Sequence, residues 1–177
     1  MEFASRLAVA ADIPALTALM HAAMRELLPA FLEPEEVAAS WEIMGLDSQL
    51  IEDGTYFVVE CDGAIAGCGG WSRRETLFGG NHTAGRSARR LDPQTEAARV
   101  RAMYTHPAYA RRGVGRRILE LCERAARAEG FTRMELAATL SGRPLYAARG
   151  YRALEKMLVP TSSGVRVPIV RMGKELP

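Results

Sequence analysis

Two glycines set among four arginines mark residues 111–117 as a candidate anion-binding turn. The segment reads Arg-Arg-Gly-Val-Gly-Arg-Arg, and a stretch with helical periodicity follows it directly. Backbone N–H groups at a helix start have no intrahelical partner and carry partial positive charge. Gly113 and Gly115 lack Cβ atoms, so a ligand can approach the backbone closely there. The combination predicts a site for a phosphate or pyrophosphate.

Two common glycine-rich phosphate motifs do not fit this turn. A P-loop requires G-x-x-x-x-G-K-[ST], and this region contains no lysine. A dinucleotide-binding motif requires G-x-G-x-x-G directly after its strand, and Ile118 stands where the third glycine belongs. Glu135 lies at the distance expected for a ribose-binding acid, but the first half of the chain supplies no further βαβ units. The turn therefore represents another kind of phosphate site.

Hydrophobic periodicity and turn residues predict the elements that position this turn. A strand is expected over 99–105, and a helix over 114–129 has an apolar stripe that includes Val114, Ile118 and Leu121. Because this helix crosses between them, the next strand should run parallel to the first. The other expected strands cover 5–9, 56–61, 64–71, 132–138, 151–159 and 165–173. The other expected helices cover 13–28, 33–44 and 145–149, with a short helical turn over 47–52.

Two stretches depart from regular patterning. Asp62-Gly63 indicates a tight hairpin, and its second strand contains Gly67, Gly69 and Gly70, which signal a bulge or a close backbone approach. The segment 72–98 is far longer than a typical connection. It is interpreted either as a solvated, partly disordered insertion or as a flap over the substrate, and the sequence favours neither.

The glycine turn resembles motif A of the Gcn5-related N-acetyltransferases, [Q/R]-x-x-G-x-[G/A]. Gly113 and Gly115 occupy the two small positions, whereas Ala110 replaces the first polar one. A second segment, Pro-Leu-Tyr-Ala-Ala-Arg-Gly-Tyr over 144–151, resembles the family's A-x-x-[FL]-Y-x-x-x-G-[FY] pattern. The separation of the two motifs and the order of elements also agree, so the resemblance covers almost the whole chain. It implies a mixed α/β (α+β) fold: a mostly antiparallel sheet of about six to seven strands with about four helices. The sheet should be splayed between the strands 99–105 and 132–138.

The resemblance also implies acetyl-CoA as acyl donor. The amides of residues 112–116 and nearby arginine side chains would hold the pyrophosphate. Backbone groups near Met103, Tyr104 and Thr105 would pair with the pantetheine arm as an added strand does. Tyr146 matches the general acid that protonates the leaving thiolate, since a phenol with a pKa of about 10 is protonated at neutral pH. The implied donor-binding set is Met103, Tyr104, Thr105, Arg111, Arg112, Gly113, Val114, Gly115 and Arg116.

The general base is not identified by the sequence. Members of this family often place a glutamate at the head of the central strand, where this chain has Arg99. A water relay could also remove the proton. The remaining candidate side chains are Glu96, Glu75, His82, Asp92, His21 and Glu26.

The leading interpretation is an N-acetyltransferase that acts on a primary amine, either a small molecule or a peptide. One alternative is a degenerate member that only binds or senses acyl-CoA, motivated by the missing glutamate. A nucleic-acid-associated protein is a weaker alternative, because the arginine clusters stand in a chain of net charge only +2. The acceptor and the oligomeric state are not specified, and a homodimer is compatible with the resemblance.

The composition is that of one domain over 1–177. No apolar run approaches the length of a membrane span, so no membrane association is expected. Cys61, Cys68 and Cys122 form no C-x-x-C pair, which argues against a disulfide framework or a metal site. A reducing, cytoplasmic setting fits this cysteine usage.

Overall fold

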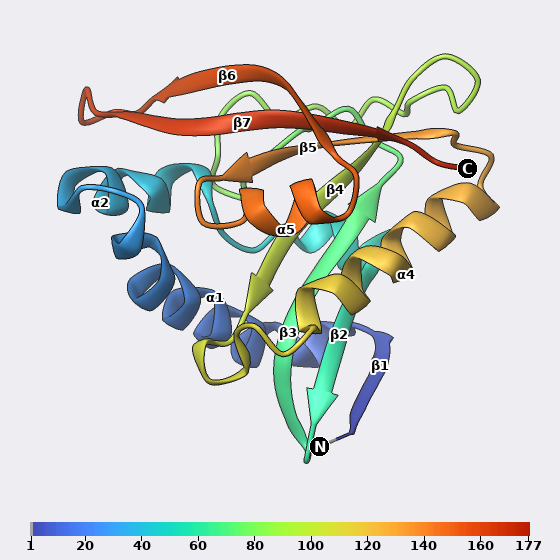
Figure 1. The fold of residues 1–177 in the computed structure, drawn as a ribbon, viewed down its shortest axis with the longest axis horizontal. Helices are drawn as coiled ribbons and strands as arrows, with labels where there is room; N and C mark the ends of the chain where they lie inside the picture. Colours follow the sequence, from blue (N-terminus) through green and yellow to red (C-terminus); the bar gives the residue numbers. More distant parts are fainter. Residues whose placement is uncertain (1) are drawn as a thin grey trace.

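The computed structural model describes residues 2–177 and forms one seven-stranded sheet in the order β1-β2-β3-β4-β5-β7-β6 (Figure 1). Neighbouring strands are antiparallel except β4 and β5, which are parallel. The strands are β1 (Phe3–Leu7), β2 (Tyr56–Cys61), β3 (Ala64–Ser72), β4 (Ala98–Thr105), β5 (Arg133–Thr139), β6 (Arg152–Pro160) and β7 (Arg166–Glu175). The helices are α1 (Ile13–Leu27), α2 (Pro34–Ile43), α3 (Ser48–Glu52), α4 (Val114–Ala128) and α5 (Arg143–Ala148). Short 3-10 turns are η1 (Ala10–Asp12), η2 (Leu28–Ala30) and η3 (Pro107–Tyr109).

The predicted mixed sheet and its order of elements are confirmed. The first strand is the main correction, because it covers Phe3–Leu7 instead of extending to residue 9. The N–H of Val9 donates to the Asp12 carboxylate at 2.8 Å, which turns the chain out of the sheet and into α1. The short helical turn expected over 47–52 is α3, and Asp47 caps it by accepting from the N–H of Gln49.

The helices cover opposite faces of the sheet. Helix α4 carries an apolar stripe, including Ile118, Leu119 and Cys122, that packs with β-strand residues and α5 into one core. Helix α1 packs Leu16 and Met20 against the other face, and α2 packs there over β7. Figure 1 shows α4 and α5 together on one side of the strands, with α1 and α2 grouped at the other end of the view. Each face of the sheet is therefore buried by its own set of helices.

A β-bulge in β4 opens the sheet. Gly70 pairs with Arg101 and Cys68 with Tyr104, so β4 has one residue more than β3 over this interval. Ala102 takes the extra position at φ +49°, and the Tyr56 hydroxyl donates to its carbonyl at 2.7 Å. Gly69 accommodates the bulge, since a Cβ there would lie 2.6 Å from Cγ of Met103. The close backbone approach predicted from the glycines is confirmed. Bulges bend a strand away from its neighbour, and β4 pairs with β5 only at Ala98 and Arg99.

The segment between β3 and β4 is ordered by many contacts, so the interpretation as a disordered insertion is wrong. Arg74 pairs with Asp53 at 2.7 Å, and Arg73 pairs with Glu129 at 2.5 Å. Leu91 is buried in the core on the α4 side. This stretch, residues 73–97, packs against the rest of the protein and has its own ion pairs, and we call it the covering segment. No helix of the described chain is long and apolar enough to cross a bilayer.

Candidate active site

A large cavity lies where β4 and β5 separate. Its volume is about 780 Å³. Its walls include Tyr146 and Leu136 from the core on the α4 side, and Met24 and Leu28 from the core on the α1 side. Residues from both faces can line one cavity only because the sheet is open at this point. The cavity therefore joins the two faces of the sheet.

The glycine turn forms the mouth of the cavity on the α4 side. Gly113 is the residue before α4 and has φ +86°, a conformation that favours glycine. Arg111, Gly115 and Arg116 line the cavity beside it. The N–H groups of the first turn of α4 have no intrahelical acceptor. This mouth consequently offers amide donors, a helix N-terminus and two guanidinium groups, which suit a phosphorylated ligand.

The other residues predicted for the donor site also lie at this cavity, with one exception. Met103, Tyr104 and Thr105 line it along the edge of β4 that turns away from β5. Val114 lines it at the start of α4. Arg112 belongs to the same turn, but it is not among the lining residues of the described chain. The unpaired edge of β4 presents backbone groups that an extended ligand can bind as an added strand.

Tyr146 lies in the wall of the cavity on α5. Its side chain is buried and packs edge-on against Tyr151, with 5.9 Å between ring centroids. Burial raises the pKa of Tyr146 above its ordinary value, so its hydroxyl keeps its proton at neutral pH. The preceding residue, Leu145, packs on the glycine turn, since a Cβ at Gly115 would lie 2.8 Å from its Cδ2 atom. The two sequence motifs are thus in contact at one site.

Most of the candidate bases lie elsewhere. Arg89 pairs with Glu75 at 3.1 Å and with Glu96 at 2.7 Å, and it lowers the pKa of both carboxyls, that of Glu96 to about 2. Asp92 caps a turn by accepting from the N–H of Gln94. His82 hydrogen-bonds the Trp41 carbonyl at 2.8 Å, and His21 packs on the same indole ring.

Glu26 is the one candidate base that lines the cavity in the described chain. It is an exposed residue in the last turn of α1. No other lining residue of the described chain carries a carboxylate. Position therefore singles out Glu26 among the candidates, although nothing in its sequence context distinguished it.

A buried ion-pair cluster fixes the cavity wall on the α1 side. Arg101 of β4 pairs with Asp47 at 3.0 Å, and both side chains are 2 % exposed. Arg101 also donates to the carbonyls of Thr76 and Gly79 at 3.2 and 2.7 Å. Arg86 pairs with the second oxygen of Asp47 at 2.7 Å. The cluster ties the 76–86 part of the covering segment to β4, and sequence reasoning missed it because its members are far apart in the chain.

The described residues contain no cluster of three or more His, Cys, Asp or Glu placed to hold a metal ion. The cysteines are buried as free thiols. The side-chain groups that line the cavity include guanidinium groups, phenols, hydroxyls and the carboxylate of Glu26.

Comparison with protein families gives one match of wide coverage. The model described as the acetyltransferase (GNAT) family matches residues 20–151. The matched range contains the glycine turn, the bulged strand and the Tyr146 helix. No curated protein matches the chain by sequence.

Solved structures with the same fold include three that span nearly the full chain. A GCN5-related N-acetyltransferase from Rhodopseudomonas palustris has TM-score 0.72 at 19% identity, covering 99% of this chain and 97% of its own. The yncA protein of Salmonella typhimurium, solved with its cofactor acetyl-CoA, has TM-score 0.66 at 18% identity, covering 100% and 95%. The PaiA N-acetyltransferase of Thermoplasma acidophilum, solved with coenzyme A, has TM-score 0.65 at 12% identity, covering 99% of both chains. At these identities the likeness is one of fold.

Proposed function

This chain belongs to the acetyltransferase (GNAT) family, and on that premise we propose that it moves the acetyl group of acetyl-CoA to a primary amine by direct attack in a ternary complex. The observation that carries the proposal is the cavity that joins the two faces of the sheet. A donor bound on the α4 side and an acceptor bound on the α1 side would meet where β4 and β5 separate. Two structural relatives were solved with coenzyme A or acetyl-CoA, which supports the choice of donor.

Each region of the cavity has a distinct task in this proposal. The amides around Gly113 and Gly115 bind the pyrophosphate, with Arg111 and Arg116 adding charge-assisted hydrogen bonds. The unpaired edge of β4 near Met103 holds the pantetheine amides. When bound, acetyl-CoA supplies an acyl group activated as a thioester. A backbone N–H of β4 aimed at the thioester oxygen would stabilise the negative charge that develops there.

Two side chains carry the proton transfers that the reaction needs. Tyr146 donates its phenolic proton to the departing thiolate, which burial favours by keeping the phenol neutral. Glu26 accepts the proton of the acceptor ammonium, directly or through one water. The neutral amine then attacks the acyl carbon and the C–S bond breaks, so that coenzyme A leaves as the thiolate that Tyr146 protonates. The attacking nitrogen gives its second proton to solvent as the amide forms, and Tyr146 regains a proton from solvent.

Isothermal titration with acetyl-CoA tests the donor site. We expect saturable binding that Arg111→Gln weakens about tenfold, the loss of one charge-assisted phosphate contact. Arg152→Gln, an exposed change on β6, is the matched control and should leave the affinity unchanged. Absence of binding at high micromolar acetyl-CoA would contradict the proposal. Release of free thiol with an amine panel separates an enzyme from a module that only binds acyl-CoA.

A further inference from the structure

The cavity has a second end, on the α1 side, whose chemistry differs from that of the glycine turn. Side chains from α1, η2, the end of α2 and the covering segment form its walls. They are Ala23, Met24, Leu27, Leu28, Ala30, Phe31, Ile43, Met44, Leu77 and Phe78. All ten are apolar. An acceptor that approaches from this side would contact hydrocarbon over most of its surface.

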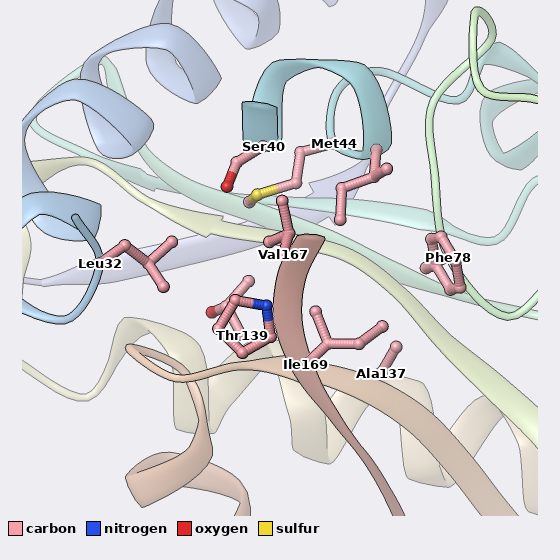
Figure 2. A pocket seen from close by; sticks show the side chains of 10 residues that line it. Leu32, Ser40, Met44, Phe78, Ala137, Thr139, Val167 and Ile169 are labelled. Carbon is pink, nitrogen blue, oxygen red and sulfur yellow. The ribbon is translucent and has the colours of Figure 1, made fainter. Parts of the chain in front are cut away.

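A small chamber of about 40 Å³ lies beside this apolar end, between α2, β5 and β7. Figure 2 shows side chains from these elements and from the covering segment pointing into it, among them Met44, Phe78, Ala137 and Ile169. Five residues line both the chamber and the large cavity, which places the chamber at the cavity's wall. They are Ile43, Met44, Phe78, Ala137 and Thr139.

The polar atoms of this chamber are already engaged. The Ser40 hydroxyl donates to the Glu36 carbonyl at 2.7 Å. The Thr139 hydroxyl accepts from the N–H of Gly142 at 3.1 Å and lies 3.0 Å from the hydroxyl of Ser141. A ligand group in the chamber would gain little by being polar, whereas an alkyl group would lose its contact with water.

The charges at this end restrict the acceptor further. Glu26 is the only carboxylate lining the cavity in the described chain, so a single ammonium can be matched there. Binding a polyamine would need further carboxylates. Arg101, a cation of the cavity wall, directs both Nη groups to Asp47 and to backbone carbonyls. These groups are therefore engaged by the protein and do not bind an acceptor carboxylate.

We infer that the acceptor is a primary amine that carries one uncharged apolar group. This inference rests on the proposed function, since it assigns the acceptor end of the same cavity. The apolar group occupies the α1-side end and reaches the chamber, and Glu26 holds the ammonium. The same chemistry is presented by a free alkylamine and by the leucine N-terminus of a peptide.

Thiol release with a matched set of amines tests the inference. The amines are 3-methylbutylamine, ethylamine, L-leucine, spermidine, and tetrapeptides that begin with leucine or aspartate. We expect kcat/KM for 3-methylbutylamine to exceed that for ethylamine, L-leucine and spermidine by about tenfold or more, from the buried methyl groups and the absence of an unmatched charge. Activity on the leucine peptide but not on 3-methylbutylamine would assign the apolar group to a peptide N-terminus. Equal kcat/KM across the set, or preference for spermidine or L-leucine, would overturn the inference.

Substitutions of residues that line the chamber provide a second test of the inference. Ala137→Leu should fill the space and lower the ratio of kcat/KM for 3-methylbutylamine to kcat/KM for ethylamine about tenfold, with acetyl-CoA affinity retained. Ala153→Leu, the same change at an exposed position of β6, is the matched control. If Ala137→Leu does not fold, Phe78→Ala on the covering segment removes apolar wall and should lower the same ratio. A ratio that neither variant changes would contradict the chamber's role.

The acceptor inference and the proposed function fail in different ways. If acetyl-CoA binds and thiol is released only with polar or charged amines, the acceptor assignment is wrong and the enzyme stands. If acetyl-CoA does not bind and no amine releases thiol, the proposed function itself is wrong.

Discussion

At the scale of single residues, Tyr146 is the group on which the proposed chemistry depends most directly. It is buried in the cavity wall, and burial raises its pKa. A general acid with a raised pKa remains protonated as the pH increases, so it should not limit turnover at mildly alkaline pH. Its neighbour Tyr151 has a similar environment, but its hydroxyl lies 3.9 Å from Sδ of Met134, in the core. The two tyrosines therefore allow a matched comparison.

We predict that Tyr146→Phe lowers kcat about a hundredfold while acetyl-CoA affinity stays unchanged, because only the proton donor is removed. Steady-state kinetics and titration calorimetry measure the two quantities. The wild-type kcat should not decline between pH 7 and about 9 through loss of this proton. Tyr151→Phe is the control and should retain kcat. Unchanged turnover in Tyr146→Phe would remove this phenol from the mechanism.

At the scale of elements, the glycine turn is distinguished by its position at the cavity. Its backbone conformation is not distinctive, because other glycines of the chain share it. Gly113 has φ +86° at the start of α4, and Gly63 has φ +80° in the β2–β3 hairpin. At both positions an added Cβ would meet open space. Alanine at either one should therefore cost a similar amount of stability, about 1–2 kcal/mol, from left-handed backbone strain.

We predict that Gly113→Ala weakens acetyl-CoA binding and that Gly63→Ala does not. The new methyl group at Gly113 stands where the ligand approaches the amides, whereas the hairpin is remote from the cavity. Calorimetry measures the affinities, and urea unfolding confirms that the stability losses match. Equal loss of affinity in both variants would mean that stability, not ligand contact, explains the effect.

The covering segment between β3 and β4 also belongs to the scale of elements. Asp47 connects Arg86 of this segment with Arg101 of the bulged strand, and all three side chains are at least partly buried. Breaking a buried pair leaves an uncompensated charge, which is costly. The cluster thus holds Phe78 and the neighbouring wall of the cavity in place. The segment functions as a fixed wall of the proposed acceptor site.

At the scale of the whole molecule, ion pairs make the free energy of unfolding depend on pH. Arginine partners lower the pKa of several carboxyls below their ordinary values, among them Asp12, Asp53, Glu75, Glu96 and Glu120. A carboxyl with a lowered folded pKa stabilises the fold above its unfolded pKa, and this contribution is lost as the pH falls toward the folded value. The carboxyls therefore favour the folded state at neutral pH.

We predict that the free energy of unfolding is constant from about pH 7 to 5 and falls steadily from about pH 4.5 toward pH 2. Urea unfolding at a series of pH values measures it. Because many of these pairs are solvent-exposed, 1 M salt should reduce the slope. Stability that is independent of pH below 4.5 would show that the pairs contribute little.

The elements could be predicted, and the residues proposed for the donor end could be selected, because their signals are local. Apolar periodicity depends on neighbouring residues, and it placed α1, α4 and most strands within a few positions. The glycine turn and the Leu145-Tyr146 segment are contiguous motifs, so each can be recognised from neighbouring residues in the sequence. The φ of +86° at Gly113 is a local backbone conformation that favours glycine.

The bulge, the buried cluster and the acceptor end were decided only by tertiary structure. The glycines of β3 signalled a bulge or a close approach, but only the structure shows that the extra residue is Ala102 of β4, whose carbonyl accepts from the hydroxyl of Tyr56. Glu26 is an exposed helical glutamate, and only the tertiary structure shows that it lines the cavity. The donor end is encoded in a few adjacent residues, and the acceptor end is a surface assembled from elements remote in sequence. The sequence alone therefore determined which fold and which donor to expect, whereas the proposed preference for an apolar amine rests on side chains that only packing brings together.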